Sequence, residues 1–149
     1  MQDPVMIVPD VNVFVSGTSI AQSPPAQIMQ AWKQNVIEVA TSEPILDDLA
    51  RVLTYPKVVR YTRMTPQEID SYIQFIRATA TLVAGTTPVA VSSDPDDDKI
   101  FSCAVEAHAD YIVSGDEKHV LPVGTYEGIQ AISPRDFVDT VLKSLKRAA

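Results

Sequence analysis

Val5-Met6-Ile7-Val8-Pro9-Asp10 is the stretch of sequence that decides the fold. A short, continuous apolar run bounded by a proline predicts a buried strand over residues 5–8. Asp10 follows that strand directly, so a carboxylate is expected at the strand's carboxyl end. The rest of the chain is interpreted outward from this point.

Beyond the first strand, short apolar runs alternate with segments of helical periodicity. Further strands are predicted at residues 36–40, 89–91, 111–113 and 129–132. Helices are predicted at residues 25–34 and 135–146, and a third begins at Ser42 and is ended by Pro56. A fourth begins at Thr65-Pro66-Gln67-Glu68 and runs to about residue 82 or 83. A fifth follows the acidic turn at 94–98 and ends near residue 109. Strands alternating with helices predict a parallel sheet covered on both faces, hence an α/β fold. The length of 149 residues favours one domain, residues 1–149.

The chain is acidic, with 12 basic against 19 acidic residues and a net charge of −7. That balance argues against a protein that binds nucleic acid by charge alone. It leaves a nuclease open, because bound cations would offset carboxylates where a phosphate must approach. No apolar run approaches the ~20 residues that span a bilayer. The start Met1-Gln2-Asp3-Pro4 has no signal-peptide pattern, and a single cysteine, Cys103, forms no internal disulfide. A cytoplasmic protein without a membrane association is expected.

Four acids are expected at one edge of the sheet. Asp10 and Asp116 each follow a strand, and Asp48 and Asp97 lie early in helices that follow strands. In open parallel sheets, ligands bind outside the carboxyl ends of the strands. Helical phase selects Asp48 over its neighbour Asp47, because Asp48 shares the inward apolar stripe. Asp97 is similarly the acid nearest the buried stripe of its helix.

Inward-facing carboxylates are costly unless they are paired, hydrogen-bonded or metal-bound, and several together raise one another's pKa. Mg²⁺ or Mn²⁺ relieves that repulsion and prefers carboxylate oxygens. Such a cluster indicates phosphodiester hydrolysis by metal-activated water. Each acid also has a plain structural interpretation: an Asx-turn for Asp10, a surface ion pair for Asp48, a solvated helix start for residues 94–98, and a turn for Asp116.

Four motifs resemble those of PIN domains, in order and spacing, over nearly the whole chain. They are Ile7-Val8-Pro9-Asp10-Val11-Asn12-Val13-Phe14-Val15-Ser16-Gly17, Ser42-Glu43-Pro44-Ile45-Leu46-Asp47-Asp48-Leu49, Asp94-Pro95-Asp96-Asp97-Asp98-Lys99 with Ala104, and Val113-Ser114-Gly115-Asp116. The nearest resemblance is to bacterial PIN proteins described as toxin components of toxin–antitoxin pairs.

The resemblance implies a three-layer sandwich with a parallel, about five-stranded sheet flanked by helices. It implies Mg²⁺- or Mn²⁺-dependent cleavage of single-stranded RNA, a homodimer and an antitoxin partner. Carried over by position, the catalytic and metal-binding acids are Asp10, Asp48, Asp97 and Asp116, while Asn12 and Ser114 orient them. The chain departs from the family pattern at Pro9 in the strand, at Asp48 where Glu is commoner, and at Ser114 where Thr is commoner.

Other side chains bear on RNA binding, catalysis and packing. Lys57, Arg60 and Arg63 form a basic group that is expected to bind RNA phosphates. Lys143, Lys146 and Arg147 form a second group, which a solvated face or a loose tail explains at least as well. His119, three residues after Asp116, fits a surface histidine better than a proton donor. Cys103 is predicted as buried filler, and Trp32 as core rather than a base-stacking platform.

Three other classes remain open at this point. A haloacid-dehalogenase-like phosphotransferase also has an aspartate after its first strand, but it needs a second aspartate two residues later, where this chain has Asn12. A receiver-like domain needs an aspartate after a middle strand and a late lysine, neither of which is evident. A non-catalytic PIN-like RNA-binding module would need a degenerate metal site, whereas all four acids are present.

Overall fold

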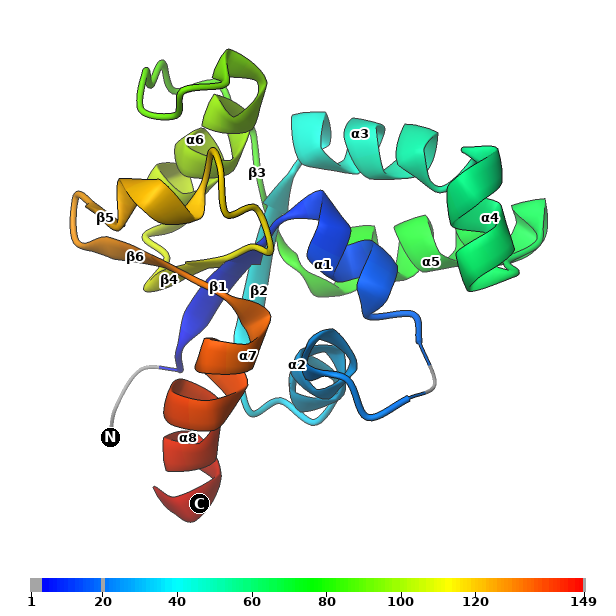
Figure 1. The fold of residues 1–149 in the computed structure, drawn as a ribbon, viewed down its shortest axis with the longest axis horizontal. Helices are drawn as coiled ribbons and strands as arrows, with labels where there is room; N and C mark the ends of the chain where they lie inside the picture. The colour runs from blue at the N-terminus through cyan, green and yellow to red at the C-terminus, as the bar shows by residue number, and fades with distance from the viewer. Residues whose placement is uncertain (1–3, 20, 149) are drawn as a thin grey trace.

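A central sheet of six strands organises the computed structural model, which describes residues 4–19 and 21–148 (Figure 1). The strands are β1 (Met6–Pro9), β2 (Glu38–Ser42), β3 (Thr81–Val83), β4 (Tyr111–Val113), β5 (Thr125–Tyr126) and β6 (Ile129–Ile132). Their order in the sheet is β3-β2-β1-β4-β6-β5. Neighbouring strands are parallel except for the antiparallel pair β5 and β6.

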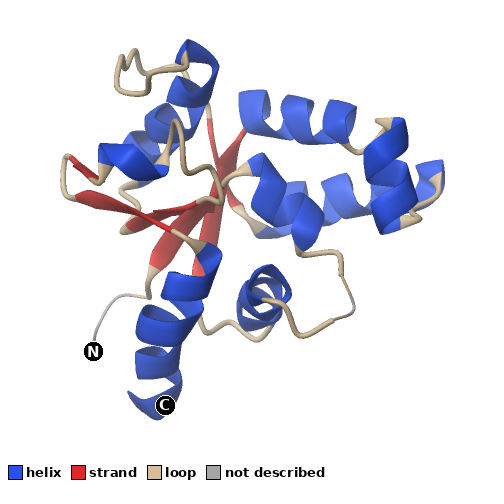
Figure 2. Cartoon of the chain, viewed as in Figure 1, coloured by secondary structure: helices blue, strands red, loops and turns tan. Residues whose placement is uncertain are grey.

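Helices cover both faces of this sheet (Figure 2). They are α1 (Val11–Ser16), α2 (Pro24–Lys33), α3 (Glu43–Val52), α4 (Pro56–Thr62), α5 (Pro66–Thr79), α6 (Asp98–Ala107), α7 (Pro134–Asp136) and α8 (Lys143–Ala148), with a π-helical segment Phe137–Leu142 joining α7 to α8. Figure 1 shows α6 on one side of the sheet and α1, α2, α3 and α5 on the other. The predicted α/β fold with a sheet between helical layers is therefore confirmed.

The strand prediction needs two corrections. A parallel sheet of about five strands is expected from the resemblance, and the sheet has six strands, of which β5 is antiparallel. The third strand is Thr81–Val83, which had been assigned to the end of the preceding helix, and residues 89–91 are not a strand. Helix α5 ends at Thr79, and the β-branched segment after it pairs with β2, from Ala40 opposite Thr81 onward. The amide of Val91 is bonded to a side chain, the carboxylate of Asp98 at 3.0 Å, rather than to another strand.

The sequence patterns predict neither α1 nor α4, and α4 is absent from the prediction because Pro56 is interpreted there as a terminator. The preceding helix, α3, ends at Val52, and Pro56 begins α4. Proline is favoured at the first helical position because its missing N–H would have no partner there. The inner face of α3 carries Ile45, Leu46 and Leu49, which are fully buried.

The chain reverses direction in the sheet between β1 and β4. After β1 it moves outward through β2 to β3, and it then returns to lay β4 on the other side of β1. The backbone N–H of Asp10 donates to the carbonyl of Val113 at 2.9 Å, which ties the ends of these two strands together. Such a reversal opens a crevice at the carboxyl ends of the strands, where ligands bind in open α/β sheets.

A single apolar core fills the space between the sheet and the helices. Ile7 and Val8 of β1 are fully buried, as predicted from the continuous run. Trp32 is 4% exposed and packs against Phe75 at 5.2 Å between ring centroids, so its assignment to the core is confirmed, as is the burial of Cys103. None of the helices in the described residues is both long and apolar enough to span a lipid bilayer.

Helix α5 begins with a complete capping box. The hydroxyl of Thr65 accepts from the N–H of Glu68 at 3.1 Å, and the carboxylate of Glu68 accepts from the N–H of Thr65 at 3.0 Å. These bonds satisfy two backbone donors that the helix itself leaves unpaired. The start of α5 predicted from residues 65–68 is therefore confirmed.

We expect Thr65→Ala to lower the free energy of unfolding by about 1 kcal/mol, because one backbone donor at the start of α5 loses its partner. Urea denaturation would measure the change from the transition midpoint at constant slope. Thr65→Ser keeps the hydroxyl and serves as the matched control. Equal midpoints for the alanine and serine variants would show that the cap contributes nothing.

Candidate active site

Asp10 is a buried carboxylate at the point where the chain leaves β1. It is the N-cap of α1, and one carboxylate oxygen accepts from the N–H of Val11 at 2.7 Å. The other oxygen accepts from the hydroxyl of Ser114 at 2.6 Å. Burial raises the pKa of Asp10, these two hydrogen bonds oppose the rise, and the nearby charge of Asp116 adds to it.

The end of β4 is built around this carboxylate. Ser114 is fully buried, and its hydroxyl donates to Asp10 while accepting from the N–H of Asp116 at 3.0 Å. The side-chain oxygen of Asn12 accepts from the N–H of Gly115 at 3.3 Å. Asn12 and Ser114 therefore join the loop after β1 to the loop after β4 and hold the two aspartates at the same edge.

Asp116 is oriented by the backbone that follows it. One of its carboxylate oxygens accepts from the N–H groups of Lys118 and His119, each at 2.9 Å. The carboxylate thus closes a turn, which was the structural alternative for this residue. Both bonds go to the same carboxylate oxygen of Asp116. The bonds that close the turn therefore also fix the orientation of its carboxyl group.

Asp97 is the third acid of the group. It ends the 3₁₀ turn Pro95–Asp97 and is the N-cap residue of α6. Its pKa is raised to about 6, first by burial, then by the charges of Asp10, Asp116 and Asp94, while His119 opposes the rise. Carboxylates from the ends of β1 and β4 and from the start of α6 therefore lie within electrostatic reach of one another.

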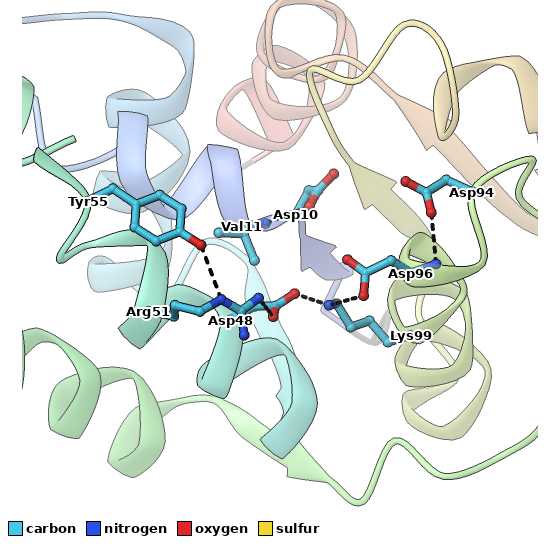
Figure 3. Close-up of polar contacts among 8 residues, drawn as sticks. All are labelled: Asp10, Val11, Asp48, Arg51, Tyr55, Asp94, Asp96 and Lys99. Carbon is cyan, nitrogen blue, oxygen red and sulfur yellow. Dashed lines mark hydrogen bonds and ion pairs between the residues drawn. The ribbon is translucent and has the colours of Figure 1, made fainter. Parts of the chain in front are cut away.

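Asp48 takes a different position from the other three acids. It faces inward from α3, with 14% of its side chain exposed, whereas Asp47 is exposed, as helical phase predicted. Its carboxylate is paired with two cations, Arg51 on the same helix and Lys99 on α6. The surface ion pair considered for Asp48 is thus present, and its second partner comes from across the site (Figure 3).

Lys99 is a charged residue of the site that the acidic motifs alone do not single out. Its ammonium group pairs with Asp48 and with Asp96 at 3.2 Å, and its side chain is 17% exposed. Burial lowers the pKa of Lys99, and the negative charge of Asp10 opposes that shift. A lysine in the first turn of a helix opposes the helix dipole, and that unfavourable placement was the signal available in the sequence.

The loop before α6 is held by side chains rather than by a strand. Asp98 accepts from the N–H groups of Val91 and Ser92 at 3.0 and 2.8 Å. The hydroxyl of Ser92 donates to the carbonyl of His119 at 2.8 Å, and Ser93 contacts the ring Nδ1 of His119 at 2.8 Å. His119 therefore braces the loop that carries Asp94 and Asp97.

The basic group predicted to grip RNA lies on and just after α4. Lys57, Arg60 and Arg63 are all exposed, and Arg63 ends the helix in a left-handed conformation at φ 57°. Lys143, Lys146 and Arg147 lie at the other end of the molecule, on α8 (Figure 1).

The acids have the donor atoms that a hard divalent cation prefers, although they are not arranged as a complete binding site. Carboxylate oxygens are the donors that Mg²⁺ and Mn²⁺ prefer, and the mutual repulsion of Asp10, Asp97 and Asp116 is what a cation would relieve. Within residues 4–19 and 21–148, no three His, Cys, Asp or Glu side chains are grouped so that they could hold a metal ion. The ammonium of Lys99, which pairs with Asp48 and Asp96, supplies positive charge within electrostatic reach of Asp10.

Comparison with known proteins places these residues in a family. The sequence pattern described as "PIN domain" matches residues 6–118, which include all four acids, Asn12 and Ser114. No curated protein matches the chain.

We expect the metal-free protein to lose stability as the pH rises from about 4 to about 6. The folded state holds a proton on Asp97 up to its raised pKa of about 6, whereas the unfolded chain releases it near 3.8, so ionisation favours unfolding across that window. Thermal melts in EDTA at steps of pH would measure the slope, and Asp97→Asn should flatten it. Asp47→Asn is the matched control and should leave it unchanged.

The same repulsion predicts how Mn²⁺ acts. Ligand carboxylates must be deprotonated to bind, so added Mn²⁺ should raise the melting temperature more at pH 7 than at pH 5. Equal shifts at both pH values, or none, would contradict a cation site built on these acids.

Lys99→Met should strengthen Mn²⁺ binding at least about five-fold, because ~1 kcal/mol of repulsion acts between unit charges a few ångströms apart in water. Electron paramagnetic resonance of free Mn²⁺ would give the dissociation constant without any measure of activity. Lys99→Arg keeps the charge and should bind as the parent protein does. Weaker binding by a folded Lys99→Met protein would mean that Lys99 organises the acids for the ion rather than competing with it.

Proposed function

The chain belongs to the PIN domain family, and from that membership we propose that it is a metal-dependent ribonuclease that acts on single-stranded RNA. PIN domains are generally nuclease domains and typically use divalent metal ions. The observation that carries the proposal is the coupling of Asp97 to Asp10 and Asp116 at the chain reversal between β1 and β4. Burying like charges together is unfavourable without a counter-ion, so the arrangement needs a functional reason.

Asp10, Asp97 and Asp116 are the proposed ligands of Mg²⁺ or Mn²⁺. When bound, the ion would supply an activated water and neutralise charge on the phosphate under attack. Ser114 and the N–H of Val11 hold the Asp10 carboxylate in place, and the N–H groups of Lys118 and His119 hold that of Asp116. Preset carboxylates lose little freedom when the substrate arrives, which favours the reaction.

Asp48 contributes to the proposed site through Lys99. Because its carboxylate is paired with Arg51 and Lys99, we propose that it fixes the Lys99 ammonium near Asp10 and that any contact with the ion is secondary. Asn12 fits an orienting role, since it braces Gly115 next to Asp116. Asn12 is an amide, so the chain also lacks the carboxylate that a haloacid-dehalogenase-like transfer would require at this position.

The biological setting is proposed from the family resemblance alone. Bacterial PIN proteins of this kind are toxins, so we propose that the chain acts as the toxin of a toxin–antitoxin pair, forms a homodimer and is held inactive by an antitoxin protein. Light scattering on the purified chain would test the dimer, and growth arrest on expression would test toxicity. Neither outcome bears on the nuclease chemistry.

Asp10→Asn and Asp116→Asn should each lower the rate of cleavage of a fluorescent single-stranded RNA in Mn²⁺ by at least about 100-fold, the upper end of what losing an outer-shell partner of a metal costs. Asp47→Asn, which alters an exposed acid on α3, is the matched control and should cleave at the parent rate. Circular dichroism would establish that each variant is folded.

Two outcomes would contradict different parts of the proposal. Full cleavage by both folded variants would remove the assignment of the acids. Cleavage that persists undiminished in EDTA would leave a nuclease but remove its dependence on metal.

A further inference from the structure

The segment between Asp48 and Glu68 has the opposite charge to the rest of the chain. Residues 49–67 contain no Asp or Glu, and they carry Arg51, Lys57, Arg60 and Arg63, in a protein whose net charge is −7. The segment runs from the second half of α3 through α4. It begins one residue after Asp48, and its four basic side chains, all exposed, are called the basic surface here. The ion pair between Arg51 and Asp48 joins this surface to the acids.

Arg51 is the first residue of that surface and is held in place on two sides. One N–H group of its guanidinium pairs with Asp48, and its Nε donates to the hydroxyl of Tyr55 at 3.3 Å. The guanidinium has further N–H groups, and 58% of its side chain is exposed. A planar cation fixed in this way can donate to a phosphate at little cost in side-chain entropy.

Tyr55 adds an aromatic ring to the same place. It is one of three large apolar or aromatic side chains exposed among the described residues, at 45%, the others being Tyr61 and Leu82. Its backbone is fixed on both sides, because its N–H donates to Val52 at 3.0 Å and its carbonyl accepts from Val59 at 2.8 Å. Tyr55 is the N-cap residue of α4 but makes no capping bond with its side chain, so the fold does not use the ring for that purpose.

Figure 3 shows these contacts as one line that runs from Tyr55 through Arg51, Asp48 and Lys99 to Asp96, with Asp10 beside it. From this line we infer that Arg51 and Tyr55 form a nucleotide-binding subsite next to the acidic centre. The guanidinium of Arg51 takes a backbone phosphate, and the ring of Tyr55 stacks on the base of a nucleotide flanking the scissile bond. Single-stranded RNA is the ligand that fits, because its bases are free to leave the stack and meet a protein ring.

This inference rests on the proposed ribonuclease function and extends it to the path of the substrate. It explains how a protein of net charge −7 binds a polyanion. The nucleotides that flank the scissile bond contact a locally basic surface. The acids approach the scissile phosphate only when a bound cation offsets their charge.

Binding of fluorescent oligouridine to the Asp116→Asn protein, in which the RNA should stay intact, tests the subsite. Tyr55→Leu should weaken binding about 5- to 100-fold, the range for losing one base–aromatic stack. Tyr55→Phe keeps the ring and should bind within about two-fold of the parent, since only the hydroxyl contact to Arg51 is lost. Tyr61→Leu is the matched control, since it removes an exposed tyrosine of α4 that has no part in the proposed subsite, and it should also bind within about two-fold.

The phosphate contact has its own readout. Arg51→Gln should lower the slope of log affinity against log salt by about 0.7, the value for one phosphate contact on a single strand, and Arg51→Lys should keep the slope. In the cleaving protein, Tyr55→Leu should raise KM and leave kcat unchanged, because stacking is the same in the bound and reacting states.

Parent-like binding by folded Tyr55→Leu protein would overturn the subsite, and so would an equal loss in Tyr61→Leu. Either result, obtained with a parent protein that cleaves RNA in Mn²⁺, leaves the ribonuclease proposal standing. A parent protein that neither binds nor cleaves RNA would instead overturn the function on which the subsite rests.

Discussion

The hydrogen bond between Asp10 and Ser114 is the contact on which the rest of the site depends. It joins the ends of β1 and β4, the two neighbouring strands at which the chain reverses direction in the sheet. Because Ser114 also accepts from the N–H of Asp116, one buried hydroxyl sets the positions of two carboxylates. Burial raises the pKa of Asp10, and the charge of Asp116 adds to the rise, so the ionised acids repel one another and a nearby cation would relieve that repulsion.

The positively charged side chains near these acids lie in a row that leads away from the acidic group. Lys99 lies between Asp48 and Asp96, Arg51 lies on the outer side of Asp48, and the segment at 49–67 continues the positive charge away from the centre. Asp48 therefore differs from the other three acids, because its carboxylate pairs with the side chains of Arg51 and Lys99. The net charge of −7 conceals this separation, since a sum over the chain says nothing of where the charges meet.

Sequence patterns failed where a local signal had two meanings. Pro56 both stops a helix and favours the first position of one, and only the packing around α4 selects the second meaning. The segment at 81–83 is compatible with the end of a helix, and it becomes a strand because β2 offers it an open edge. Val91 belongs to a short apolar run, yet its N–H is taken by Asp98.

The sequence by itself determined the α/β class, the strand that Asp10 follows, the cap at Thr65, and the inward phase of Asp48, because each depends on residues close together in the chain. The tertiary structure decided which charges meet: Lys99 with Asp48 and Ser114 with Asp10 are pairs separated by 51 and 104 residues. Periodicity says which way a side chain faces from its own helix or strand. What that side chain meets depends on how distant elements pack, which no local pattern records.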